Sequence, residues 1–177
     1  LAKGNFDNYS DIDLHIIVTP EKKENFIKEK RKRPKQWGEV SYYEDVSPNR
    51  PVIVVHYDCF VKMDTWYHEP KEIQKSFWMQ GLEVLYDPRD MLKEVLEESN
   101  LLEYKPTIDE VELWRGKVFA YIHEAYRSLM RDEIYDSMNN LDKFRWMMAR
   151  GWYMEKGIRV DSSWGVWSKL EGKRSYL

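Results

Sequence analysis

The sequence has little of several features that define whole classes of protein. It holds a single cysteine, Cys59, in 177 residues; this excludes an intramolecular disulfide framework and is typical of a reducing compartment. No apolar run approaches the ~20 residues that cross a bilayer, and the first residues carry no signal-peptide pattern. We therefore predict a cytoplasmic protein with no membrane partner.

The chain also lacks a strong excess of either charge. It has 28 Lys and Arg against 31 Asp and Glu, a formal net charge of -3, which argues against a nucleic-acid partner. Aromatic residues, by contrast, are abundant, with eight tryptophans and twelve tyrosines. Such rings form either a heavily aromatic core or the wall of a ligand pocket, and the sequence leaves both interpretations open.

The first half of the chain, to about Pro88, alternates short apolar runs with turn residues. This texture predicts strands at 11–18, 40–43, 51–57, 60–67 and 82–86, and helices at 20–32 and 72–80. Strands interleaved with helices predict a sheet flanked by helices. The predicted fold class is α+β: a mixed β-sheet with flanking helices, followed by an α-helical bundle.

The second half predicts helices only. Thr107 and Glu110 form a capping-box pattern before a long amphipathic stripe, and a second long helix follows, ending near Gly157. A third helix is expected from Ser162. These observations predict two domains, 1–104 and 105–177, the second built as a bundle.

Two aspartates mark the junction between a polar loop and the first strand. Asp11 and Asp13 are two residues apart, so they project to one face of a strand while Ile12 and Leu14 line the other. Adjacent carboxylates repel each other unless a cation lies between them. Oxygen ligands of this kind suit Mg²⁺, which commonly binds one or two carboxylates together with substrate phosphates.

This stretch resembles the polymerase-β-like nucleotidyltransferase superfamily. The similarity rests on Leu1-Ala2-Lys3-Gly4 followed by Ser10-Asp11-Ile12-Asp13-Leu14. In that family a Gly-Ser pair directly precedes this region and grips the triphosphate, and the two aspartates hold metals. The chain starts at Leu1, so the resemblance predicts that it is part of a longer protein.

The family uses a third carboxylate on a neighbouring strand. Asp64 lies in the middle of the predicted strand 60–67, where an ionisable side chain is costly without a partner. Asp58 is the alternative, but its neighbours predict a turn, where aspartate commonly makes local hydrogen bonds. We therefore predict that Asp64 faces the same site as Asp11 and Asp13, in a two-metal arrangement.

The resemblance implies further roles for residues outside the three carboxylates. It implies Mg²⁺ as the metal and an NTP, most simply ATP, as the donor. Ser10, Gly4 and Lys3 would bind the nucleotide. The resemblance maps no motif onto the helical half, where the polar side of the first long helix offers Glu110 or Glu124 as a general base and Lys117 as a phosphate contact.

A second element is similar to the antibiotic-modifying branch of the family. Residues 81–88, Gly-Leu-Glu-Val-Leu-Tyr-Asp-Pro, resemble the segment after the catalytic hairpin in aminoglycoside and lincosamide nucleotidyltransferases. The branch implies a small-molecule hydroxyl as acceptor, antibiotic resistance as the role, and homodimers in some members. Two alternatives stay open: adenylylation of a partner protein, as in toxin–antitoxin pairs, and a catalytically silent binding module.

Overall fold

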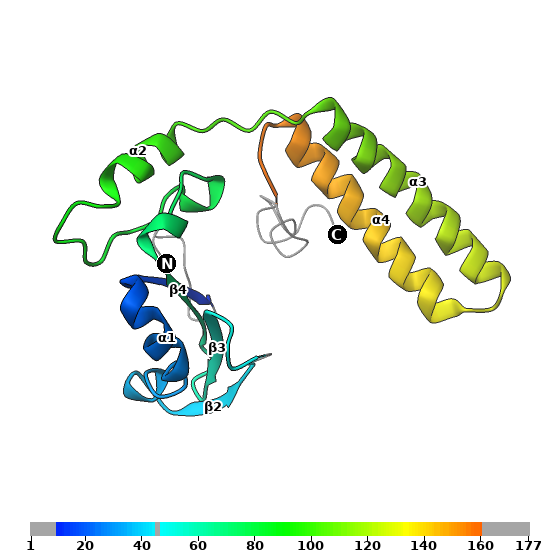
Figure 1. Ribbon diagram of the computed structural model, residues 1–177. Coiled ribbons are helices and arrows are strands. Elements are labelled where there is room, and N and C mark those ends of the chain that lie inside the picture. Colours follow the sequence, from blue (N-terminus) through cyan, green and yellow to red (C-terminus); the bar gives the residue numbers. More distant parts are fainter. Residues whose placement is uncertain (1–9, 45–46, 161–177) are drawn as a thin grey trace. The chain divides into compact units, whose positions relative to one another are not determined.

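The computed structural model describes residues 10–44 and 47–160. The chain divides into two compact units, Leu1–Leu102 and Glu103–Leu177 (Figure 1). The division falls two residues before the domain boundary predicted from the sequence. Each unit has its own secondary structure and its own packing.

The first unit is built on a four-stranded mixed sheet. Its strands are β1 (Ile12–Ile17), β2 (Val40–Tyr43), β3 (Val52–Tyr57) and β4 (Lys62–His68). They are ordered β1-β4-β3-β2, with β1 parallel to β4 and the other two pairings antiparallel. The combination of this mixed sheet with helices confirms the α+β class.

One face of the sheet forms the core of the unit. Ile53, Val55 and Tyr67 are almost completely buried because alternate residues of β3 and β4 point to this side. Helix α1 (Pro20–Lys28) packs against β4, and the Phe26 ring meets the Tyr67 ring edge-on at 6.0 Å between centroids. The hairpin turn at Asp58 and Cys59, predicted from the sequence, joins β3 to β4.

A buried lysine connects α1 to the loop before β3. Lys30 is 2% exposed, and its ammonium group donates to the backbone carbonyls of Ser47, Arg50 and Val52 at 2.8, 3.1 and 3.2 Å. These bonds replace the water that a buried charge would lose. The helix predicted to reach residue 32 ends at Lys28, and Lys30 turns inward just beyond its end.

The segment after β4 differs from its prediction. The expected helix over 72–80 is wrong: the structure has two short 3₁₀ turns, Pro70–Glu72 and Phe77–Met79. The expected strand over 82–86 is also wrong, and helix α2 (Lys93–Asn100) was not predicted. The side chain of Gln80 donates to the carbonyls of Ser99 and Leu102, both at 2.8 Å. Bonds to residues this far along the chain compete with helix formation at Gln80. The hydrophobic periodicity of residues 72–80 does not reveal them.

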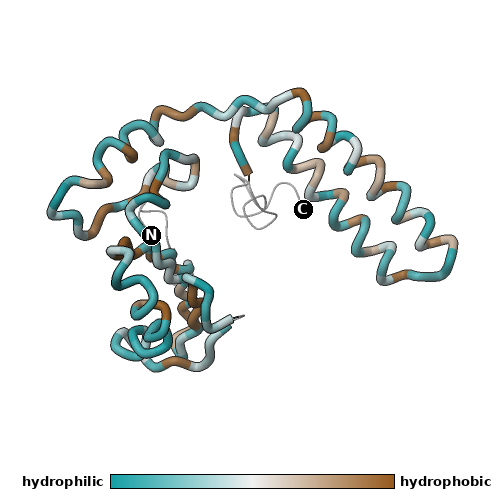
Figure 2. Tube along the Cα trace, viewed as in Figure 1, coloured by the Kyte–Doolittle hydropathy of each residue, from teal (hydrophilic) through white to brown (hydrophobic). Residues whose placement is uncertain are grey.

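The second unit is a hairpin of two long helices, α3 (Ile108–Met130) and α4 (Ile134–Glu155), lying side by side (Figure 1). The predicted capping box is confirmed: Thr107 N donates to Glu110, and Glu110 N donates to the Thr107 hydroxyl. Apolar and polar residues alternate along both helices in Figure 2, as expected for amphipathic segments. The third helix predicted from Ser162 falls outside the described residues.

No helix in the parts of the chain that the structure describes is long and apolar enough to span a membrane.

Two helical glycines provide a test of how tightly the hairpin packs. A Cβ added at Gly151 would lie 2.5 Å from the Trp114 ring, whereas one added at Gly116 would meet nothing within 4 Å. The Trp114 ring is fixed because its Nε1 donates to the Met147 carbonyl at 2.6 Å. We expect Gly151→Ala to destabilise the protein by about 1–3 kcal/mol through overpacking. We expect Gly116→Ala to stabilise it by about 0.5–1 kcal/mol through helix propensity.

The measurement is the free energy of unfolding in urea for both variants. Equal effects of the two substitutions would contradict the close contact between α3 and α4 at Gly151.

Candidate functional site

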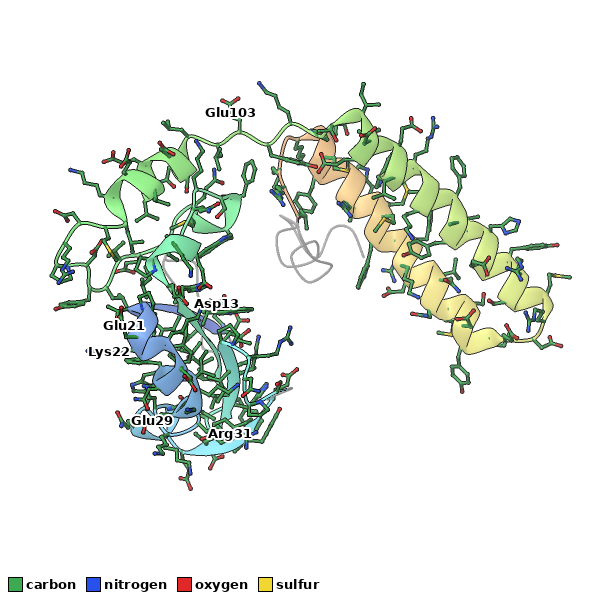
Figure 3. All side chains as sticks on the ribbon, viewed as in Figure 1. Asp13, Glu21, Lys22, Glu29, Arg31 and Glu103 are labelled. Carbon is green, nitrogen blue, oxygen red and sulfur yellow. The ribbon has the colours of Figure 1, made fainter. Side chains whose placement is uncertain are left out.

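Parallel pairing of β1 with β4 places two of the predicted acidic residues side by side. Asp13 and Asp64 are direct partners in the register of these strands. Their side chains project from the sheet face opposite the buried core, since the flanking residues Met63 and Thr65 point the other way. Figure 3 labels Asp13 on this sheet. A pairing of residues 51 positions apart in the sequence thus creates a local concentration of negative charge.

Lys62 connects Asp11 to Asp64. Its ammonium group donates to Asp11 Oδ2 at 3.3 Å and lies 3.2 Å from Asp64 Oδ1. Lys62 precedes Asp64 by two residues on β4, so the alternation of the strand places both on one face. Asp11 and Asp64 therefore flank one lysine, which the sequence interpretation did not assign to the site, and Asp13 lies beside Asp64 in the strand pairing.

The charges of the site shift the acidity of its members. The pKa of Asp13 is raised, first by partial loss of solvation and then by the negative charges of Asp11 and Asp64. Burial alone would lower the pKa of Lys62, but the carboxylates of Asp64 and Asp11 outweigh it, so the pKa of Lys62 is raised. The lysine is thus held in its charged form.

The alternative third carboxylate, Asp58, lies elsewhere. It belongs to the hairpin turn and accepts a hydrogen bond from the Ser41 hydroxyl of β2. In the sheet order, β2 and β1 occupy opposite edges. The side chain of Asp58 is therefore bonded to β2, the edge strand opposite β1, and its partner Ser41 lies 17 positions away in the sequence.

The chemistry of the donors suits a hard divalent cation. Carboxylate oxygens are the ligands that Mg²⁺ prefers, commonly one or two of them together with substrate phosphates. The buried Oδ1 of Asp64 also accepts no well-aligned hydrogen bond from the described residues, leaving it available as a ligand. Among those residues, however, no three His, Cys, Asp or Glu side chains converge at metal-binding distances. The ammonium group of Lys62 lies between Asp11 and Asp64 instead.

A cluster of aromatic rings continues along the same sheet face. His15 pairs with Trp66 in the strand register, and their rings are nearly parallel with centroids 6.4 Å apart. The Trp78 ring stacks on His15 at 4.8 Å. His15 Nδ1 and His68 Nε2 are 2.9 Å apart and share a hydrogen bond. Burial, reinforced by the nearby His68, lowers the pKa of His15 to about 4.

The sequence held a signal for this cluster. His15 has the same strand parity as Asp13, and Trp66 and His68 have the parity of Asp64. The sequence interpretation treated the four histidines as structural. The packing of His15 and His68 among rings agrees with that interpretation, while their position next to the carboxylates was missed.

The predicted nucleotide-binding residues lie before β1. Ser10 directly precedes Asp11 and is partly buried. Gly4 and Lys3 fall outside the described residues. Of the three, only Ser10 can be placed next to the carboxylates.

The predicted acceptor residues belong to the second unit. Glu110 is engaged in the capping box at the start of α3. Glu124 pairs with Arg127 at 2.7 Å, and Lys117 is exposed on the same helix. Their proposed action on an acceptor stays a prediction.

The second unit contains an open hollow of about 340 Å³. Its lining is mostly apolar and includes Trp114 and Trp152, with Glu155 as its acidic residue. The sequence interpretation anticipated an aromatic pocket wall as one of two options for the tryptophans, without placing it.

Comparison with known proteins adds no relative to this picture, since the sequence matches no protein family and no curated protein. The resemblance to nucleotidyltransferases therefore rests on the residues quoted from the chain itself.

The raised pKa of Asp13 predicts a site that costs stability. When a folded carboxyl has a raised pKa, the folded state binds a proton more readily than the unfolded state. Stability is therefore lost as the pH rises through the raised pKa. We expect Asp13→Asn to raise the Tm by a few degrees at pH 7, and this gain to vanish near pH 3. The measurement is thermal unfolding followed by circular dichroism across that range.

Asp87 supplies the opposite control, because backbone hydrogen bonds, led by that from Leu92 N, lower its pKa. Asp87→Asn should bring no gain at pH 7. A Tm for Asp13→Asn at or below the wild-type value at pH 7 would contradict the repulsion among the carboxylates.

The lowered pKa of His15 predicts a different pH dependence. As the pH falls from about 6.5 to 4, the unfolded chain takes up a proton on this histidine and the folded chain does not. The free energy of unfolding therefore decreases as the pH falls through this window. We expect His15→Phe, which retains a flat ring against Trp78, to lose less Tm than wild type between pH 7 and pH 5. His123→Phe, at an exposed position of α3, should keep the wild-type slope. Parallel slopes for all three proteins would refute burial of a neutral His15.

Proposed function

We propose that the protein is a metal-dependent nucleotidyltransferase that moves a nucleoside monophosphate, with ATP as donor, onto a hydroxyl group of a small molecule. The observation that carries this proposal is the gathering of Asp11, Asp13 and Asp64 on one open face of the sheet. Carboxylate oxygens are the ligands of the Mg²⁺ ions that accompany triphosphates. The loop residues that resemble the superfamily lead directly into the first of these aspartates.

The reaction would form and break one bond each at the α-phosphorus. The acceptor oxygen attacks this phosphorus, the bond to the bridging oxygen of the β-phosphate breaks, and pyrophosphate leaves. Bound Mg²⁺ would neutralise the triphosphate and favour loss of the acceptor proton. Asp11, Asp13 and Asp64 would hold the metal, and Asp64 would help to remove the acceptor proton. Positioning and charge neutralisation by the protein would supply most of the acceleration.

The acceptor side of the proposal rests on the second unit. The hollow is lined by two aromatic residues, Trp114 and Trp152, and by the acidic residue Glu155. Rings and an acidic group suit an amino sugar, since both cations and sugar faces pack favourably on aromatic rings. An aminoglycoside or lincosamide is therefore the acceptor class to test first, and antibiotic resistance the corresponding role.

One observation favours a second candidate, a catalytically silent binding module. Lys62 already neutralises part of the acidic cluster, and no three metal-binding side chains converge among the described residues. A permanently neutralised cluster would need no metal. The two candidates differ in whether metal and nucleotide bind at all.

Thermal shift separates the two candidates. We expect the Tm to rise by several degrees only when Mg²⁺ and ATP are both present, since a ligand at 100 times its Kd stabilises by about 2.7 kcal/mol. The shift should disappear in an Asp11→Ala/Asp13→Ala double variant and persist in Asp87→Asn. Pyrophosphate release on adding an aminoglycoside or a lincosamide would then identify the acceptor class. A cooperative melt that no nucleotide shifts would leave the silent module.

A further inference from the structure

We propose that Lys62 is a displaceable counterion of the carboxylate site: a divalent metal takes its place between Asp11 and Asp64, and the released ammonium group then contacts the phosphates of the nucleotide. The inference rests on the proposed function, because it assigns a role to a residue of the same site. The juxtaposition that carries it is one ammonium nitrogen at 3.3 Å from Asp11 and 3.2 Å from Asp64.

An ammonium ion and a divalent metal compete for the same oxygens. Mg²⁺ binds carboxylate oxygens at about 2.0–2.1 Å with octahedral geometry, so a metal between Asp11 and Asp64 would repel the ammonium group that lies between them. Asp64 Oδ1 receives the charge of Lys62 without a well-aligned hydrogen bond. The lysine thus balances the charge of this oxygen without saturating it, and a metal can exploit the remaining lone pairs.

The side chain of Lys62 has the exposure and the flexibility that displacement requires. Its side chain is 36% exposed and ends in a compact charge on a flexible four-carbon stem. Because it is anchored on β4 two residues before Asp64, a displaced ammonium group stays next to the site. A lysine close to a bound triphosphate acts as a point charge on phosphate oxygens. The same group would therefore stabilise the site before metal binding and the nucleotide after it.

A purely structural ion pair predicts the opposite response to substitution. If Lys62 only held the carboxylates in place, its removal would scatter them and weaken metal binding. If Lys62 competes with the metal, its removal must strengthen metal binding in the absence of nucleotide. The sign of one measurement therefore separates the two roles.

The probe is Mn²⁺, titrated into the protein without nucleotide and followed by electron paramagnetic resonance and calorimetry. We expect Lys62→Met to bind Mn²⁺ about tenfold more tightly than wild type, the scale on which one neighbouring charge shifts the proton affinity of a carboxylate. Lys62→Arg, which keeps the charge, should bind Mn²⁺ as weakly as wild type. Lys75→Met is the matched control, since Lys75 pairs with Glu98 and its loss should change nothing.

A second measurement uses the wild-type protein and does not depend on a variant that folds. The rate at which acetic anhydride labels Lys62, read by peptide mass spectrometry, should rise on adding Mn²⁺ and fall again on adding ATP. Labelling that Mn²⁺ leaves unchanged or lowers would overturn the proposal. So would Mn²⁺ affinity in Lys62→Met equal to or below that of wild type.

Failure of the counterion and failure of the enzyme leave different traces. If Lys62→Met binds Mn²⁺ more tightly but no variant binds nucleotide, Lys62 is a counterion that competes with metal. The proposals of nucleotidyl transfer and of a contact between Lys62 and phosphate would then both be wrong. If the wild type binds ATP only with metal but Lys62→Met has unchanged Mn²⁺ affinity, the proposed nucleotidyltransferase function is supported. The proposal that Lys62 competes with the metal would then be wrong.

Discussion

Parallel pairing of β1 with β4 is the constraint on which the rest of the first unit depends. It joins β1 to β4, which also pairs with β3 in a hairpin. The register of this pairing places Asp13 beside Asp64 and His15 beside Trp66. A slip by one residue would turn each side chain of β1 to the other face and would bury its carboxylate in the core. The apolar face of the sheet therefore fixes the geometry of the polar one.

The two faces of the sheet are stabilised by different interactions. The buried face depends on apolar packing of β3 and β4 and on α1, which is attached through Lys30 and its three carbonyl partners. The open face depends on charge: carboxylates that repel one another are held together by Lys62. The pKa of Asp13 is raised first by partial burial and then by the charges of Asp11 and Asp64, while the same carboxylates raise the pKa of Lys62 and keep it charged. A surface that accepts such repulsion commonly serves a function.

The local sequence predicted those helices and strands in which neighbouring residues all favour the same secondary structure. β-branched residues in 52–55 predicted β3, and the Thr107–Glu110 capping box predicted the start of α3. Prediction failed between β4 and α3, where Gln80 bonds to carbonyls near the end of α2. Those bonds join residues about 20 positions apart, so propensity and periodicity within a short window carry no trace of them. The segment consequently looked like a helix and a strand, and α2 was missed.

The sequence by itself determined which side chains share a face of each strand, because strand alternation has a fixed period of two. It therefore determined that Asp64 accompanies Lys62 on β4, and that Asp13 has the strand parity of His15. Only the tertiary structure decided that these two strands are neighbours, that Asp58 bonds to Ser41 of β2, and that the ammonium group of Lys62 lies between two carboxylates. The physical reason is that pairing between distant strands depends on the packing of the whole sheet, whereas alternation depends only on the backbone of each strand.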